Sequence, residues 1–245
     1  MNGEWFRSFA PAAGDAARLI CFPHAGGAAS AYFALARALA PHVEVVAVQY
    51  PGRHDRRREP AVTDLRLLAG LVTEALGVPD RPYALFGHSM GAIVAHETAR
   101  LLAGRPGPGP LRLFLSGRGA PSAALRETGP RDDAALLAEI RRLGGTDGAR
   151  LDDPDLLELA LPVLRADYAA LGGYRWTGGP PLDTPVSVLV GAADPLVPPG
   201  RAEAWREHTT GPFELRVFPG GHFYLGDATE EVAGLVTAAL TAGVA

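Results

Sequence analysis

A serine stands between two glycines where the chain is expected to turn from a strand into a helix. Residues 87–91 read Gly-His-Ser-Met-Gly, after the apolar run 83–86 and before the helix-forming stretch 92–102. In that context the motif presents its serine hydroxyl as a nucleophile. A Cβ atom at either glycine would crowd the strand and helix packed against this strained turn. We therefore predict that Ser89 is a nucleophile; an ordinary glycine-rich turn is the alternative.

A carboxylate and an imidazole follow in the order that such a serine requires. The β-rich run 186–191 leads to Asp194, and the strand candidate 214–218 leads to His222 on a glycine-rich loop. Open α/β sheets build their sites beyond the carboxyl ends of their strands, and in α/β-hydrolases the acid and then the histidine follow the serine. We predict that His222 takes the proton of Ser89 and that Asp194 orients the imidazole.

Other acids are less well placed for this role. The strand candidate 111–115 is followed by Ser-Gly-Arg-Gly, without a carboxylate, and neither Asp183 nor Asp227 lies at a predicted strand end. Taken singly, Asp194 could be a turn-forming Asp-Pro and His222 a surface histidine. Their combination with Ser89 is what favours a catalytic triad.

A glycine-rich loop after an early strand candidate could supply an oxyanion hole. The buried-strand pattern at 19–22 runs into Pro-His-Ala-Gly-Gly at 23–27, which resembles the His-Gly-Gly loops that lend a backbone N–H to an oxyanion. We predict that the amides of Ala25 and Met90 are the two donors. For His24 we favour a structural imidazole over a role in proton transfer.

Strands and helices alternate along most of the chain. This alternation predicts an α/β-hydrolase fold, with a mostly parallel sheet covered by helices on both faces. The strand candidates fall near 18–23, 43–48, 82–87, 111–116, 185–191 and 213–218, and the helical stretches near 28–40, 63–77, 90–104, 199–208 and 228–243.

Residues 118–180 interrupt the alternation, because they show helix starts near 130 and 152 and no convincing strand. We expect a helical lid insertion here, inside a single domain that spans residues 1–245. Such a lid could exclude water and bind the substrate. A plain helical decoration is the alternative.

The composition limits the classes of function. Of the 245 residues 47% are hydrophobic and 20% charged, as in ordinary globular proteins, and the formal net charge of −4 argues against nucleic-acid binding as the main task. No apolar run is long enough for a membrane span, and no signal peptide is evident. The single cysteine, Cys21, fits a reducing compartment. We expect a cytoplasmic protein without a metal or a cofactor.

Four arginines lie close together after the second strand candidate. Residues 50–60 read Tyr-Pro-Gly-Arg-His-Asp-Arg-Arg-Arg-Glu-Pro. We expect Arg53 to brace the Pro-Gly-Arg turn, whereas Arg56, Arg57 and Arg58 are candidates for docking an acidic partner. A solvated, partly self-paired loop is the alternative.

Together these segments resemble the discrete type II thioesterases that accompany polyketide synthases and non-ribosomal peptide synthetases. The resemblance covers nearly the whole chain. Besides the motifs above, it rests on Tyr-Pro-Gly-Arg at 50–53 and on Leu-Arg-Ala-Asp-Tyr at 164–168, which separate this family from general lipases and esterases. The chain departs from the family at 171–174, where Leu-Gly-Gly-Tyr lacks the acidic residue often found before the tyrosine.

The resemblance implies a serine thioesterase that hydrolyses acyl groups from the phosphopantetheine arm of acyl or peptidyl carrier proteins. This activity would clear stalled or mis-primed units in polyketide or non-ribosomal peptide biosynthesis. The partner implied is a carrier protein, with no nucleic acid and no membrane, and we expect a monomer. Two other functions stay open: a serine esterase or acyltransferase acting on small-molecule acyl substrates, and a catalytically silent hydrolase fold used for binding.

Overall fold

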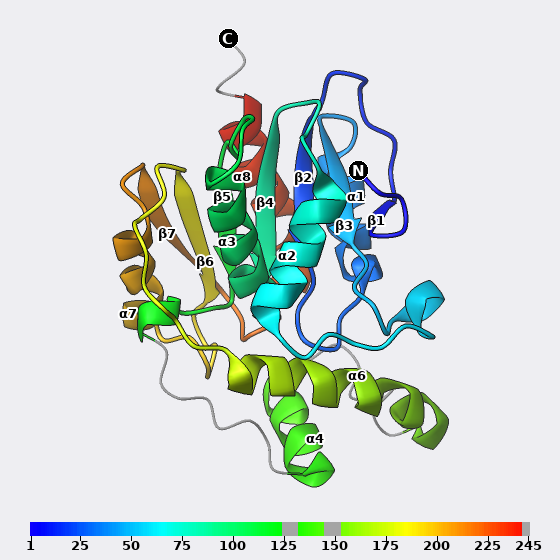
Figure 1. Ribbon diagram of the computed structural model, residues 1–245. Helices are drawn as coiled ribbons and strands as arrows, with labels where there is room; N and C mark the ends of the chain where they lie inside the picture. The colour runs from blue at the N-terminus through cyan, green and yellow to red at the C-terminus, as the bar shows by residue number, and fades with distance from the viewer. Residues whose placement is uncertain (124–131, 145–152, 242–245) are drawn as a thin grey trace.

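The centre of the protein is one mostly parallel sheet. In the computed structural model, which describes residues 1–123, 132–144 and 153–241, seven strands are ordered β1-β3-β2-β4-β5-β6-β7 (Figure 1). Only the β1–β3 pair is antiparallel. Each of the six strand candidates overlaps a strand, and the predicted fold class is confirmed. The strands are β1 (Phe6–Ser8), β2 (Ala17–Phe22), β3 (Val43–Val48), β4 (Tyr83–His88), β5 (Leu113–Ser116), β6 (Val186–Gly191) and β7 (Phe213–Phe218).

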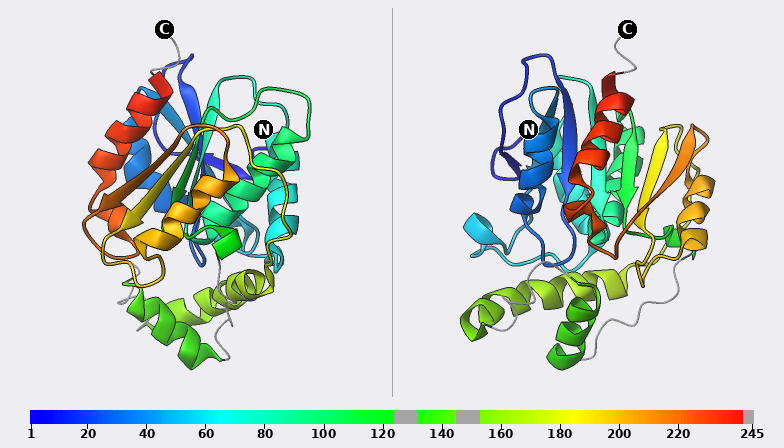
Figure 2. Two further views of the ribbon diagram at one scale, coloured as in Figure 1. Left: turned by 90° about the vertical axis from the view of Figure 1, so that its left-hand side faces the viewer. Right: turned by 180° about the vertical axis from the view of Figure 1, so that it is seen from behind.

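Helices cover both faces of the sheet (Figure 2). On one face lie α2 and α3, and on the other lie α1 and α8. Neighbouring residues of a strand point to opposite faces, so Leu85 packs with the α2–α3 side whereas Phe86 packs with the α1–α8 side. The helices are η1 (Ala29–Tyr32), α1 (Phe33–Leu39), η2 (His54–Arg56), α2 (Leu65–Leu76), α3 (Met90–Ala103), η3 (Pro121–Ala123), α7 (Pro199–Glu203), η4 (Ala204–His208), η5 (Tyr224–Gly226) and α8 (Thr229–Thr241).

Two further helices, α4 (Asp133–Arg142) and α6 (Pro154–Gly173), lie beyond the end of the sheet at which β2 and β4 end: α6 lies across that end, and α4 lies farther out, against α6 (Figures 1 and 2). Each begins after an aspartate whose side chain accepts hydrogen bonds from the first turn, Asp132 for α4 and Asp153 for α6. They belong to the expected insertion at 118–180, of which residues 124–131 and 145–152 lie outside the described residues. The single-domain organisation stays a prediction.

The segment that returns from α6 to the sheet is fastened to α3. The hydroxyl of Tyr174 donates to Glu97 Oε1 at 2.6 Å, and Arg100 donates to the carbonyl of Gly178 at 2.9 Å. The Arg100 guanidinium also lies over the Trp176 ring, 4.5 Å from its centroid. These contacts hold the segment after α6 against α3, the helix that directly follows Ser89.

His96 of α3 is buried in an aromatic cluster that includes Trp176 of the segment after α6. Its ring centroid lies 5.6 Å from that of Trp176, 4.9 Å from Trp205 and 5.1 Å from His208. Burial lowers the pKa of His96 well below its ordinary value, and the charges of protonated His208 and of Arg100 act in the same direction. His96 is therefore neutral in the folded protein at pH 7.

A neutral buried histidine makes stability depend on pH. In the unfolded chain His96 titrates near pH 6.5, so below that pH the unfolded state binds more protons than the folded state. The free energy of unfolding should therefore fall on acidification below pH 6.5, by at most about 1.4 kcal/mol per pH unit for this group. His96→Phe, which retains the ring contacts, should reduce the loss between pH 7 and pH 5.5 by about 1 kcal/mol in urea unfolding.

The matched control is His42→Gln, because His42 is exposed. This variant should keep the pH dependence of the parent protein. An unchanged pH dependence in His96→Phe would contradict the assignment of a neutral His96.

Candidate active site

Ser89 occupies a strained turn between β4 and α3. Its backbone has φ 54° and ψ −116°, which is unusual for a residue other than glycine. The flanking glycines allow the turn because a Cβ at Gly91 would lie 1.9 Å from the carbonyl oxygen of Phe22, and one at Gly87 would lie 2.2 Å from that of Gly91. The predicted need for both glycines is confirmed.

The hydroxyl of Ser89 begins a chain of hydrogen bonds. Ser89 Oγ lies 2.9 Å from His222 Nε2, and His222 Nδ1 lies 2.8 Å from Asp194 Oδ2. The second carboxylate oxygen of Asp194 accepts from the amide of Leu196 at 2.8 Å. The serine, aspartate and histidine are 8%, 6% and 1% exposed. The structure thus brings together the three residues that we expected to form a triad.

Two loops with direct backbone contact bring the acid and the base together. Asp194 follows β6 and His222 follows β7, as expected, and the amide of Ala193 donates to the carbonyl of Gly220 at 2.9 Å. A Cβ at Gly191 would lie 2.1 Å from the carbonyl oxygen of Gly221, so only glycine fits there. This close packing sets the position of the carboxylate relative to the imidazole.

The two other acids are not part of this arrangement. Asp183 and Asp227 are exposed, and neither bonds to His222 in the part of the chain that the structure describes. The end of β5 contributes backbone instead, since the carbonyl of its last residue, Ser116, accepts from the amide of Ser89 at 2.8 Å.

The expected oxyanion loop begins directly beside the serine turn. The Cβ that Gly91 lacks would also lie 2.7 Å from the carbonyl oxygen of Pro23, so the start of loop 23–27 packs on the first turn of α3. Within the described residues, neither the amide of Ala25 nor that of Met90 donates a hydrogen bond. The role of both amides stays a prediction.

Two further histidines surround His222 and are neutral. The His88 ring lies 5.2 Å from that of His222, and its Nδ1 lies 2.8 Å from Ser116 Oγ. Burial lowers the pKa of His88 well below its ordinary value and that of His24 to about 4, and the charge of protonated His222 adds to both shifts. Both imidazoles are therefore uncharged at neutral pH, in keeping with a structural His24.

Helix α6 contacts loop 23–27 through Asp167, a residue to which the sequence analysis gave no role. Asp167 Oδ2 accepts from the amide of Gly26 at 2.7 Å and forms a buried ion pair with Arg53. A Cβ at Gly26 would lie 2.4 Å from Leu164 Cδ2, so α6 also packs on the loop. The Leu-Arg-Ala-Asp segment was the only sequence signal for this contact.

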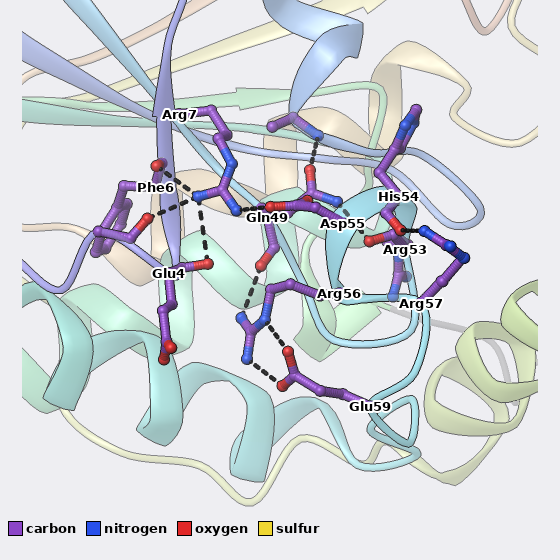
Figure 3. A network of polar contacts seen from close by, with 12 residues as sticks. Glu4, Phe6, Arg7, Gln49, Arg53, His54, Asp55, Arg56, Arg57 and Glu59 are labelled. Carbon is purple, nitrogen blue, oxygen red and sulfur yellow. Dashed lines mark hydrogen bonds and ion pairs between the residues drawn. The ribbon is translucent and has the colours of Figure 1, made fainter.

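The arginine loop, residues 53–58, is held by hydrogen bonds of its own side chains (Figure 3). Arg56 is buried, donates to both carboxylate oxygens of Glu59 at 2.7 and 2.6 Å, and lies 4.1 Å from the centroid of the Trp5 ring. Arg56 therefore holds its own loop instead of facing a partner, and we drop it from the docking surface. Arg57 and Arg58 are exposed.

Arg53 braces its turn, as expected. Its Nε donates to the carbonyl of Gly27 at 2.9 Å and its Nη1 to that of Pro51 at 2.8 Å.

The described residues contain no group of three or more histidine, cysteine, aspartate or glutamate side chains that could hold a metal ion. None of the helices there has the length and apolar character needed to cross a membrane. The expected absence of a cofactor stays a prediction.

The chain is similar to proteins of known family. Residues 17–240 match the family model of the thioesterase domain. The chain is 50% identical over 224 residues to a probable cadicidin biosynthesis thioesterase of Streptomyces griseus, a match that covers 91% of this chain and 62% of that relative. It therefore spans less than two thirds of that relative's length.

Two other relatives match over most of their length. Thioesterase PikA5 of Streptomyces venezuelae is 49% identical over 234 residues, with 94% of this chain and 83% of the relative covered. The structure of BorB, a type II thioesterase from the borrelidin biosynthetic cluster, superposes with a TM-score of 0.90 at 43% identity and covers 98% of this chain and 99% of its own.

The contact at Gly91 predicts a sharp effect of one methyl group. Gly91→Ala should force β2 and α3 apart and destabilise the protein by about 1–3 kcal/mol or more, as overpacking does. It should also abolish labelling of Ser89 by a serine-directed fluorophosphonate, because the turn that presents the hydroxyl would shift. Thermal unfolding and mass spectrometry of the labelled protein measure the two effects.

Gly70→Ala in α2 is the control. A Cβ there meets no atom within 4 Å, and alanine should stabilise the helix by about 0.5–1 kcal/mol. Equal stability and labelling of the Gly91→Ala variant and the parent protein would contradict the close approach.

Proposed function

The chain belongs to the thioesterase family and is a thioester hydrolase, and we propose that Ser89, His222 and Asp194 carry its reaction. The observation that supports these roles is the continuous hydrogen-bonded chain from the Ser89 hydroxyl to the Asp194 carboxylate. The proposed substrate is an acyl group on the phosphopantetheine arm of a carrier protein in polyketide or non-ribosomal peptide biosynthesis.

The first half of the reaction acylates the serine. Ser89 Oγ attacks the thioester carbonyl carbon while its proton passes to His222 Nε2, 2.9 Å away. Asp194 accepts the Nδ1–H of the imidazole and stabilises the imidazolium. The carbonyl oxygen becomes an oxyanion, which we propose is bound by the amides of Ala25 and Met90. Collapse breaks the carbon–sulfur bond, and the pantetheine thiol leaves with the proton from His222.

The second half of the reaction hydrolyses the acyl-enzyme and releases the carboxylic acid product. A water molecule gives a proton to His222 and attacks the acyl-enzyme carbonyl, which forms a second oxyanion in the same place. Collapse returns the proton to Ser89 Oγ, breaks the ester bond and frees the carboxylic acid. Of the three imidazoles His24, His88 and His222, it is His222 whose hydrogen bonds reach both Ser89 and Asp194 among the described residues, so we assign both proton transfers to it.

The environment of the loop at 53–58 supports docking of an acidic carrier protein. This protein has a net charge of −4, so an acidic partner needs a local positive surface. Arg57 and Arg58 are exposed in a loop that follows β3 and is joined to α6 through Arg53. We propose that these two arginines steer the carrier protein, and that α4 and α6 form part of the acyl site.

Three further expectations stay predictions. We propose a single domain over residues 1–245, a monomer, and a location in the cytoplasm. The supporting observation for a reducing compartment is that Cys21 is buried as a free thiol.

The triad assignment predicts the result of single substitutions. Ser89→Ala and His222→Ala should each lower kcat by roughly 10⁵- to 10⁶-fold while the fold is retained, since triad members act as a unit. Asp194→Asn should cost roughly 10⁴-fold, because the imidazole then takes the wrong tautomer. Steady-state hydrolysis of an acyl-carrier protein, with circular dichroism as the fold check, measures this.

Asp183→Asn and Asp227→Asn are the matched controls and should retain activity. Loss of turnover in either control, together with near-normal turnover in Asp194→Asn, would show that the acid has been assigned wrongly.

The docking proposal predicts a substrate-dependent effect. Replacing Arg57 and Arg58 with serine should raise KM for acyl-carrier protein roughly 3- to 10-fold, as expected for two exposed ion pairs. The effect should shrink at high salt because of screening. KM for an acyl thioester of N-acetylcysteamine should stay unchanged, because that substrate lacks the protein surface.

Arg37→Ser combined with Arg216→Ser makes the same charge change elsewhere, on α1 and on β7. This control should leave both KM values unchanged. Equal losses on the carrier-bound and the small thioester would rule out docking by Arg57 and Arg58.

A further inference from the structure

The turn that contains Ala25 is held from outside by side chains. The amide of Gly27 donates to the carbonyl of His24 at 2.9 Å, which closes a four-residue turn. Gly26, the third residue, has φ 75°, which is typical of a type II turn. Type I and type II turns differ in the orientation of their central peptide group, here the one that joins Ala25 to Gly26. Glycine adopts either conformation at little cost, so the turn residues alone do not decide it.

Asp167 holds that central peptide group. Its Oδ2 accepts from the amide of Gly26 at 2.7 Å, which is the N–H of the Ala25–Gly26 peptide. The acceptor comes from α6, 141 residues later in the chain, and Asp167 is 1% exposed. A buried carboxylate is thus aimed at the one peptide group whose orientation the turn leaves free.

Arg53 fastens the other side of the same turn. Its Nη2 pairs with Asp167 Oδ2 and its Nε donates to the carbonyl of Gly27 at 2.9 Å. Gln49 extends the network, since its side chain accepts from the amide of Ala29 at 3.0 Å and donates to the carbonyl of Arg53 at 3.0 Å (Figure 3). Gly26, Gly27 and Ala29 are therefore each held by a side chain from outside the loop.

We propose that Asp167 is a positioning residue for the oxyanion hole: from α6, with Arg53 as its partner, it keeps the turn 24–27 in its type II form. The Ala25 N–H belongs to the preceding peptide of the same turn, and holding the turn in place keeps this amide in position for the oxyanion. This inference rests on the proposed thioesterase mechanism. A donor of this kind lowers the barrier only if it is already oriented before charge develops. The rate of the chemical step is then coupled to the seating of α6, a helix that contributes no member of the triad.

The kinetic test uses Asp167→Asn, which is similar in size and removes the charge. It should lower kcat for a small acyl thioester by about 10- to 100-fold, because the turn is no longer held. The upper value is close to the loss seen when one oxyanion donor is removed. KM should change less than about twofold, because the interaction that is lost forms only as the oxyanion develops. Arg53→Lys should act in the same direction, since an ammonium cannot reach both Asp167 and the Gly27 carbonyl as the guanidinium does.

Inhibitor binding gives a second readout that a purely structural role would not move. An alkyl trifluoromethyl ketone is attacked by Ser89 to form a hemiketal oxyanion, whereas a thioether analogue of the substrate has no carbonyl to attack. In Asp167→Asn the inhibition constant of the ketone should rise by the same factor as kcat/KM falls. The dissociation constant of the thioether should stay unchanged. Equal weakening of both ligands would overturn the proposal.

Arg165→Gln is the matched control on the same helix. Arg165 pairs with Asp133 of α4, is largely exposed, and among the described residues forms no hydrogen bond or ion pair with loop 23–27. It should retain kcat and ketone affinity. A loss in Arg165→Gln as large as that in Asp167→Asn would show that any disturbance of α6 has this effect, and would overturn the specific role of Asp167.

Stability is separated from positioning by a double variant. Removing one member of a buried ion pair leaves an uncompensated charge, which is strongly destabilising. Arg53→Gln combined with Asp167→Asn leaves no unpaired charge, so it should recover thermal stability without recovering kcat. Recovery of both would show that Asp167 acts only through stability, and would overturn the proposal.

The two proposals can fail separately. A parent protein that hydrolyses no carrier-bound thioester but binds the trifluoromethyl ketone at Ser89 would overturn the substrate proposal alone. The ketone and thioether measurements would still decide the role of Asp167. Unchanged ketone affinity in a folded Asp167→Asn variant would overturn the positioning role, whatever the natural substrate is.

Discussion

The contact of α3 with the carbonyl oxygens at the end of β2 is the constraint on which the rest of the site depends. At Gly91 there is no room for even one carbon atom, because the Phe22 carbonyl occupies that space. This approach lets the chain turn through the strained conformation of Ser89, and it places loop 23–27 beside the serine. The positions of Ser89 and of loop 23–27 are thus set by one backbone-to-backbone contact, and a similar contact at Gly191 joins the loops of Asp194 and His222.

The surroundings of His222 favour a single proton-transfer path. Burial keeps His24 and His88 neutral, so neither of these two imidazoles places a positive charge beside His222. Asp194 supplies the one charge bonded to His222, and its other oxygen is held by the Leu196 amide. The negative charge of the triad therefore lies at the end of the path away from Ser89, where it stabilises an imidazolium.

Helix α6, over the carboxyl end of the sheet, is tied to loop 23–27 and to the arginine loop. Arg53 and Asp167 form a buried pair that links the arginine loop, loop 23–27 and α6. A buried pair is costly to desolvate, and it persists here with further hydrogen bonds to Gly26 and Gly27. Neighbouring arginines of the loop differ in their surroundings. Arg56 is buried between Glu59 and Trp5, whereas Arg57 and Arg58 face solvent.

The sequence by itself determined the alternation of strands and helices, the Ser89 turn, and the order of acid and base, because these depend on local patterns: apolar runs, glycines and residues just past strand ends. It did not reveal β1, since three residues form a strand only when Phe6 lies opposite Val48. It could not separate Arg56 from Arg57, because burial depends on Trp5, far away in the chain. Only the tertiary structure placed Asp167 against Gly26, because a hydrogen bond between residues 141 positions apart exists only once α6 has packed on the loop, and no local periodicity records it.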